Sequence, residues 1–406
     1  MKVAFIVPGK LPVPAVQGGA IESLLNSLLD ANERIGSLET IVFSEYHKEA
    51  ERLSKNFVHT KFVFIKRGRL FHSLNLLFKL GRKLSCNRTS YLDIHLIVRI
   101  IRRIKPDKII IEGSILKLLE LRKFFSNDQL VFRLHADLIR ERSTENMQVL
   151  NSASLFIVAS DFLRKRIRQN SGNLNPRVRI LRNGIRNEFY NMVDETYKSK
   201  ILNKYQIKGS VTVVLYVGRI VESKGIMHLL ESLIKSRERI PLHFVIVGSF
   251  GSGFGMGDMD DRFCVRVKDL IQKNKDWITI TGFVQNIDLP SYYQIADVIV
   301  VPSICEDVSP LVVNEAMASG TPLIVTDAGG ITEYIDNECA IVIKRDEKMV
   351  DNLSIALCDL LSDPEKLSAM RNAARSNSLK YTLDEFYYNF YSILNDPIHE
   401  ASEVRK

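Results

Sequence analysis

The chain has 406 residues, of which 46% are hydrophobic and 25% are charged, and its net charge is +9. This length and composition exclude a disordered chain and indicate two globular domains. No apolar run reaches the roughly 18 residues of a membrane-spanning helix. The five cysteines form no C-x-x-C pair and no Cys/His ligand spacing, so we expect reduced thiols in a cytoplasmic protein.

Short β-branched runs alternate with helix-length segments along the whole chain. This alternation is typical of parallel sheets with crossover helices, and strands that are apolar nearly throughout indicate sheets buried on both faces. The predicted strands are 3–7, 40–43, 62–65, 108–111, 130–134, 155–158, 178–181, 211–217, 242–247, 278–281, 298–301, 323–325 and 341–343.

A polar interruption over residues 191–210 marks the boundary between two α/β domains, which we place at 1–190 and 191–380. Residues 381–406 are predicted to form a C-terminal helix, which crosses back to the first domain, and a tail. No Pro/Gly-rich linker separates the two halves, so we expect closely apposed domains.

The positive charge lies mostly in the first half. Residues 61–108 contain thirteen Lys/Arg against two Asp, and residues 162–187 contain eight Arg/Lys and no acid. Such windows predict an anionic partner: a phospholipid surface, a nucleic acid or a phosphorylated acceptor. Residues 70–84 have the pattern of a basic amphipathic helix, which either lies in a membrane interface or packs on the core with a solvated basic face.

The stretch "GRIVESKG" (218–225) follows a predicted strand and opens a helix. Arg219 and Lys224 add positive charge where a helix N-terminus already carries some, which favours an anionic ligand. The alternative is two solvated side chains in a loop. The stretch is neither a Walker loop nor a G-x-G-x-x-G motif.

A second polar group follows the strand 298–301. Glu306 and Asp307 precede Ser309, Pro310 and Leu311, which open a helix that carries Glu315. Acids that flank a helix start can hold sugar hydroxyls with a diphosphate between them. The alternative is one acid that complements the helix dipole and one solvated glutamate.

Together these stretches resemble the retaining GT-B glycosyltransferases of family 4. The resemblance rests on "GRIVESKG", "GFVQN", "ADVIVVPSICEDVSPLVVNEAMASGTPLIV" and "GGITEYI", and in the first half on "QGGAIE", "RLHAD", "ASDFLRKRI" and "LRNGI". It implies two Rossmann-like, doubly wound parallel-sheet domains that face each other across a cleft. It also implies transfer of a hexose or N-acetylhexosamine from a nucleotide-diphosphate sugar, in particular a UDP-sugar, to a lipid-linked or polysaccharide acceptor in cell-surface glycan synthesis.

The resemblance also implies roles for single residues. It assigns Gly18 and Gly19 to a glycine loop at the donor phosphates and His135 to a contact with the transferred sugar. Arg219 and Lys224 would neutralise the leaving diphosphate. The further donor-binding positions that it implies are Asn183, Val284, Ser309, Pro310, Leu311 and Glu315, of which Glu315 would hold the ribose and Val284 the base.

The first acid of the family's pair differs here. The usual spacing of Glu-x7-Glu falls on Asp307, and Glu306 is one residue too early, so either residue is a candidate for that role.

Breaking the sugar–diphosphate bond develops negative charge that fixed cations stabilise. We therefore expect no metal and no cofactor, although "DMD" (258–260) has a metal-ligand spacing. The expected partners are the donor, a lipid-linked or glycan acceptor and an anionic membrane surface at the cytoplasmic side.

Other functions are less well supported. A non-catalytic GT-B-like module, which binds glycan or assists an active transferase, is the main alternative. Nucleic-acid binding lacks a recognised motif, and a dehydrogenase lacks G-x-G-x-x-G.

Overall fold

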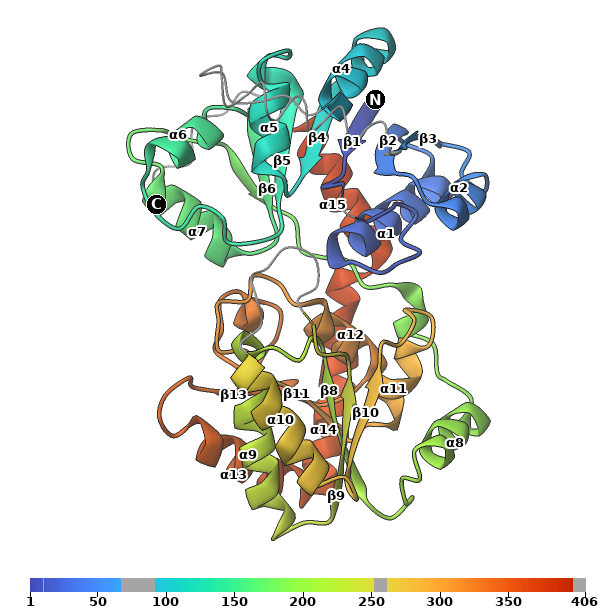
Figure 1. Cartoon of the computed structure of the whole chain (residues 1–406), viewed down its shortest axis with the longest axis vertical. Helices are drawn as coiled ribbons and strands as arrows, with labels where there is room; N and C mark the ends of the chain where they lie inside the picture. Colours follow the sequence, from blue (N-terminus) through green and yellow to red (C-terminus); the bar gives the residue numbers. More distant parts are fainter. Residues whose placement is uncertain (10, 67–91, 252–260, 397–406) are drawn as a thin grey trace. The chain divides into compact units, whose positions relative to one another are not determined.

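The computed structural model describes residues 1–9, 11–66, 92–251 and 261–396 (Figure 1). The chain divides into two compact units. Unit 1 comprises Met1–Ala159, Arg164–Gly184 and Leu383–Lys406, and unit 2 comprises Ser160–Leu163 and Ile185–Thr382. The predicted helix at 70–84 and the "DMD" residues 258–260 lie outside the described residues.

Unit 1 is built on a parallel sheet, which over the described residues has seven strands in the order β3-β2-β1-β4-β5-β6-β7. Ala4 in β1 pairs with Ile41 of β2 on one side and with Ile109 of β4 on the other. All of the predicted first-half strands are confirmed. The strands are β1 (Lys2–Ile6), β2 (Glu39–Glu45), β3 (Thr60–Ile65), β4 (Lys108–Glu112), β5 (Leu130–Leu134), β6 (Leu155–Val158) and β7 (Val178–Ile180).

Helices cover this sheet, and the last helix of the chain belongs to them. Its buried aromatic face includes Phe390, whose ring stacks on Phe5 of β1 at 6.0 Å, and Tyr387, whose hydroxyl donates to Asn32 Oδ1 at 2.6 Å. The helices are α1 (Ala20–Ile35), α2 (Lys48–Ser54), α4 (Leu92–Ile104), α5 (Ile115–Leu121), α6 (Thr144–Leu150), α7 (Asp161–Asn170), which begins in unit 2, and α15 (Leu383–Asn395).

Unit 2 repeats the architecture with a parallel sheet, which over the described residues has six strands in the order β10-β9-β8-β11-β12-β13. The predicted second-half strands are confirmed as well. They are β8 (Thr212–Val217), β9 (Leu242–Val247), β10 (Ile278–Gly282), β11 (Val298–Val301), β12 (Leu323–Thr326) and β13 (Ala340–Ile343).

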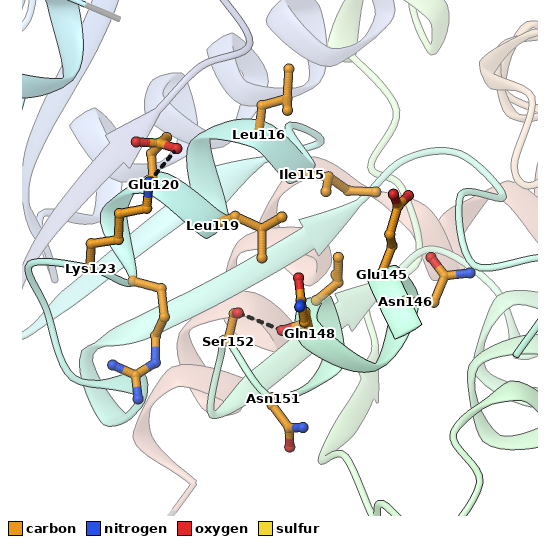
Figure 2. A pocket seen from close by; sticks show the side chains of 12 residues that line it. Ile115, Leu116, Leu119, Glu120, Lys123, Glu145, Asn146, Gln148, Asn151 and Ser152 are labelled. Atoms are coloured by element: carbon orange, nitrogen blue, oxygen red, sulfur yellow. Dashed lines mark hydrogen bonds and ion pairs between the residues drawn. The ribbon is translucent and has the colours of Figure 1, made fainter. Parts of the chain in front are cut away.

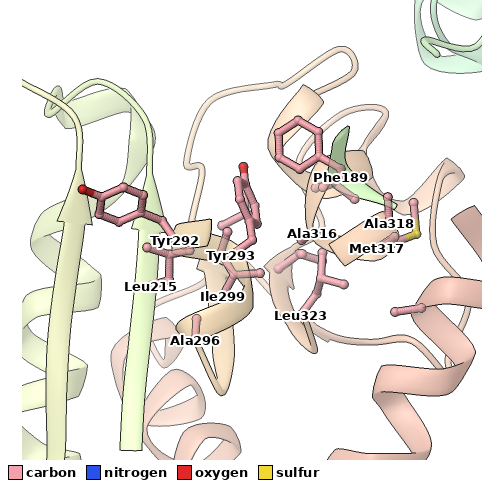
Figure 3. Packing of buried hydrophobic residues seen from close by; sticks show 14 of the residues in the cluster. Phe189, Leu215, Tyr292, Tyr293, Ala296, Ile299, Ala316, Met317, Ala318 and Leu323 are labelled. Carbon is pink, nitrogen blue, oxygen red and sulfur yellow. The ribbon is translucent and has the colours of Figure 1, made fainter. Parts of the chain in front are cut away.

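A tightly packed core supports one face of this second sheet. Phe189, Tyr293 and Met317 are fully buried in it, and the rings of Phe189 and Tyr293 meet edge to face at 5.4 Å (Figure 3). The helices of unit 2 are α8 (Glu195–Lys204), α9 (Ile226–Arg237), α10 (Asp261–Lys273), α11 (Leu289–Ile295), α12 (Leu311–Ser319), α13 (Met349–Leu361) and α14 (Pro364–Ser378).

The strand order reverses once in each sheet, between β1 and β4 in unit 1 and between β8 and β11 in unit 2. In doubly wound sheets ligands bind outside the carboxyl ends of the strands at this reversal. The segments that follow these strands are therefore the places to look for a site. Among the described residues, no helix is both long and apolar enough to cross a bilayer.

Candidate functional site

In unit 2, the segment after β8 packs directly against the segment after β11. Gly225, at φ +69°, opens α9, and a Cβ there would lie 1.8 Å from the carbonyl oxygen of Pro302. Only glycine allows this approach of the two backbones. It brings Lys224, the last residue of the 3-10 turn Glu222–Lys224, next to the loop that carries the predicted acids.

Lys224 forms an ion pair with Asp307 Oδ2, which also accepts a hydrogen bond from Ser303 Oγ at 3.3 Å. The two charged side chains are 30% and 14% exposed. This pair is therefore desolvated enough to be ordered, yet it still reaches water where an anionic ligand could approach Lys224.

The loop that carries Asp307 is held from behind by two glycines. The N–H of Gly330 donates to the carbonyl oxygen of Asp307 at 2.7 Å, and a Cβ on Gly329, at φ +56°, would lie 2.5 Å from that oxygen. These glycines begin the "GGITEYI" stretch. Their close packing on the backbone of Asp307 explains why glycine is needed at the start of this stretch.

The two adjacent acids point to different partners. Glu306 accepts a hydrogen bond from Arg345 Nη2 at 3.2 Å, and Arg345 Nε donates to Asp327 at 3.0 Å. Of the two candidates for the first acid, Asp307 is the one that contacts Lys224.

Arg219 lies half-buried at the end of β8. Its carbonyl oxygen accepts a hydrogen bond from the Tyr216 hydroxyl at 2.7 Å. Burial raises the pKa of Tyr216, and the charges of Arg219 and Asp307 also act on it. Tyr216 thus lies close to both of these predicted site residues and keeps its proton.

Helix α12 begins beside this pair. Pro310 is its N-cap, and within the described part of the chain no side chain caps it and no acid lies in its first turn, which Leu311 opens. Ser309 Oγ donates to the Tyr334 hydroxyl at 2.5 Å, so this serine is turned to the core. The N-terminal end of the helix dipole favours an anion here.

Glu315 lies one turn further along α12. Its Oε2 accepts a hydrogen bond from the Tyr293 hydroxyl at 2.7 Å. Burial raises the pKa of Glu315, although the charge of Arg186 and the hydrogen bond act in the opposite direction. Arg186 also donates to the carbonyl oxygen of Asn286 at 3.0 Å, in the loop where Val284 packs on the core.

In unit 1, the glycine loop lies between β1 and α1. Gly18 and Gly19 have φ of +76° and +93°, a region that favours glycine, and Gly19 is the N-cap of α1. A Cβ on Gly19 would lie 2.4 Å from Oε2 of the buried Glu22. An acid, which sequence reasoning did not single out, therefore already lies at this helix N-terminus.

His135 follows β5 and contacts the last residue of β4. Its Nε2 lies 2.5 Å from Oε2 of Glu112, which is fully buried, and Arg133 Nη1 lies 3.4 Å from the other Glu112 oxygen. Burial lowers the pKa of His135. Burial alone would raise the pKa of Glu112, but Arg133 and His135 together hold that pKa below its usual value.

The remaining predicted residue of unit 1, Asn183, is buried next to Gly184. A Cβ on Gly184 would lie 2.7 Å from Phe386, so α15 packs directly on this segment. Sequence reasoning missed Glu112, Arg133, Arg186 and Tyr293. A charged residue that ends an otherwise apolar strand, as in "IIIE", was the available signal for Glu112.

A pocket of about 690 Å³ lies between α5 and α6 of unit 1 (Figure 2). Leu116, Leu119 and Val149 give it an apolar lining, and Lys123 and Glu145 are among its charged residues. It contains none of the predicted site residues. Among the described residues, no group of three or more His, Cys, Asp or Glu could hold a metal ion.

Comparisons with known proteins now identify the class. The chain is similar to the crystal structure of HepE from Anabaena in complex with UDP, with a TM-score of 0.75 and 18% identity over 98% of this chain and all of that one. Sucrose-phosphate synthase from Thermosynechococcus elongatus gives a TM-score of 0.72 at 19% identity, over 97% of this chain and 98% of that one. The chain therefore has the GT-B fold of glycosyltransferases.

The sequence comparisons agree with this class. Residues 198–377 match the family model "Glycosyl transferases group 1". Putative glycosyltransferase YtcC of Bacillus subtilis (strain 168) is 23% identical over 93% of this chain and 87% of the relative. Spore coat protein SA of the same strain is 26% identical over 93% and 95%. The chain is thus a glycosyltransferase, and its residues 198–377 are similar to the group 1 family.

Proposed function

We propose that the protein is a retaining transferase of family 4. It moves a hexose or N-acetylhexosamine from a UDP-sugar to a lipid-linked or polysaccharide acceptor in cell-surface glycan synthesis. The observation that carries the proposal is the partly exposed pair of Lys224 and Asp307, which lies at the strand reversal of unit 2 beside the open N-terminus of α12. HepE, a protein of similar fold, was crystallised with UDP and with UDP-glucose.

In the proposed reaction the diphosphate binds at Lys224, Arg219 and the start of α12. These groups are fixed before the reaction and face the charge that grows on the leaving diphosphate. They stabilise the transition state more than the ground state. Glu315 holds the ribose, the loop at Val284 receives the base, and His135 contacts the transferred sugar.

A thermal-shift panel of UDP-, GDP- and ADP-sugars tests the donor. The proposal predicts stabilisation by UDP-sugars and release of UDP from one of them when EDTA is present. A strict requirement for Mn²⁺ would refute the cation site described here. Binding of UDP without any turnover, with lipid-linked or polymeric glycan supplied as acceptor, would instead favour a non-catalytic module.

We also propose that unit 1 contacts an anionic membrane surface. Among the described residues, the amphipathic helix α4 supports this proposal. Its exposed residues include Leu96, Arg99, Arg102 and Arg103. Arginines near anionic lipid each contribute on the order of 1 kcal/mol, and an exposed leucine can enter the interface.

Vesicle pelleting tests this surface. Changing the three arginines to Glu should abolish pelleting with phosphatidylglycerol-containing vesicles, with no change for pure phosphatidylcholine. A matched control changes Arg262, Arg266 and Lys268, exposed on α10 of unit 2, to Glu. If both variants pellet with these vesicles as well as the parent protein does, α4 is excluded as the membrane contact.

A further inference from the structure

The cluster of Glu112, Arg133 and His135 in unit 1 fixes which ring nitrogen of His135 carries a proton. Nε2 lies 2.5 Å from Glu112 Oε2, and in the described part of the chain this is the only hydrogen bond of the imidazole. Glu112 is fully buried, and its other oxygen faces Arg133, itself only 3% exposed. A buried carboxylate with an arginine partner is an acceptor only, so the nitrogen that faces it must donate.

We propose that Glu112 and Arg133 are positioning residues that hold His135 as its Nε2–H tautomer and present Nδ1 as a hydrogen-bond acceptor. The group that His135 receives is then a donor, such as a sugar hydroxyl, and not a carboxylate or phosphate. This inference rests on the proposed function only for the identity of that ligand. The tautomer itself follows from the contacts within unit 1.

The electrostatics of the cluster agree with this arrangement. Burial lowers the pKa of His135, so its ring is neutral at neutral pH, while Arg133 and His135 hold the pKa of Glu112 low enough for it to remain a carboxylate. The guanidinium of Arg133 also lies over the Phe386 ring, 5.3 Å from its centroid, which fixes the arginine from the side of α15. His135 itself is 11% exposed, so only a small part of the ring can meet a ligand.

The variant Glu112→Gln gives a distinctive result. Arg133 can only donate, so the Gln carbonyl must turn to Arg133 and its NH₂ must face His135 Nε2. Nε2 then has to accept, and the ring proton moves to Nδ1. The substitution therefore inverts the tautomer instead of merely removing a contact, and a purely structural role for Glu112 does not predict this.

The test is ¹⁵N NMR of the full-length protein with labelled histidine, with His135→Asn used to assign the resonances. We expect a protonated Nε2 and an unprotonated Nδ1 in the parent protein at neutral pH, and the reverse in Glu112→Gln. A parent protein with Nδ1 protonated, or with both nitrogens protonated, would overturn the proposal. This measurement on the parent protein does not depend on whether Glu112→Gln folds.

Ligand titrations separate this inference from the function. UDP-glucose should shift the Nδ1 resonance, whereas UDP alone should not. In Glu112→Gln the release of UDP from UDP-glucose should fall about 10- to 100-fold, while UDP affinity stays within about 2-fold. If the parent protein binds no UDP-sugar, the proposed function fails, although the tautomer is still measured. If UDP-glucose binds and Nδ1 does not respond, the ligand part of this inference is wrong.

Discussion

Both units place an acid and a cation at the carboxyl ends of parallel strands, but the two ion pairs differ in their exposure to water. In unit 1, Glu112 and Arg133 are 0% and 3% exposed, whereas in unit 2 Lys224 and Asp307 are 30% and 14% exposed. A fully buried ion pair cannot exchange partners without leaving a charge unpaired. A partly exposed pair can, because a ligand anion can replace or share the acid. The first cluster therefore orients His135, and the second is the one suited to bind an anion.

The largest effect should come from removing the accessible cation. Lys224→Ala should lower the transfer rate about 100- to 1,000-fold, because the developing charge on the diphosphate loses a fixed cation. The measurement is UDP release from a UDP-sugar at saturating acceptor. Lys235→Ala, which breaks an exposed pair with Asp351, is the matched control and should keep full activity.

The two adjacent acids should behave differently. Asp307→Asn should lower the rate about 10- to 100-fold, since it leaves Lys224 without its charged partner. Glu306→Gln should change the rate less than about 3-fold, because Glu306 faces Arg345 in an exposed network. Steady-state kinetics of the two variants in parallel check this, and the reverse order of effects would show that Glu306 is the functional acid.

Glu315→Gln should separate stability from binding. Because burial raises the pKa of Glu315 above its usual value, ionising this residue costs the folded state stability as pH rises. The ligand-free variant should therefore melt about 1 to 4 °C higher than the parent at pH 7 to 8. The difference should vanish at a pH below the pKa that Glu315 has in the unfolded chain. Thermal melts from about pH 4 to pH 8 measure it.

The same variant should bind UDP about 10-fold more weakly if Glu315 holds the ribose. Titration calorimetry at about pH 7.5 tests this second half. A melting temperature near neutral pH equal to or below that of the parent would contradict the buried-charge argument, whatever the affinity.

A small effect on binding is expected at the hydroxyl that orients Glu315. Tyr293→Phe removes one hydrogen bond of 2.7 Å and leaves the aromatic packing on Phe189 in place. We expect UDP affinity to fall about 2- to 5-fold, while the melting temperature stays within about 2 °C of that of the parent protein. A loss as large as that of Glu315→Gln would mean that the tyrosine itself contacts the ligand.

The sequence alone determined the two parallel sheets, because the strands are short and mainly apolar, and helix-length segments separate them along the chain. It also placed Lys224, Asp307 and Glu315 near helix starts, since the residues that follow a strand lie at the edge where ligands bind. These conclusions depend only on neighbours along the chain.

The partners of these residues were decided by tertiary structure. Whether Glu306 or Asp307 meets Lys224 depends on the approach of Gly225 to Pro302, two segments that are far apart in the sequence. The burial of Glu112 against His135 likewise depends on the pairing of β4 with β5. Hydrogen bonds and desolvation act between groups that only the folded chain brings together, so residue spacing cannot reveal them.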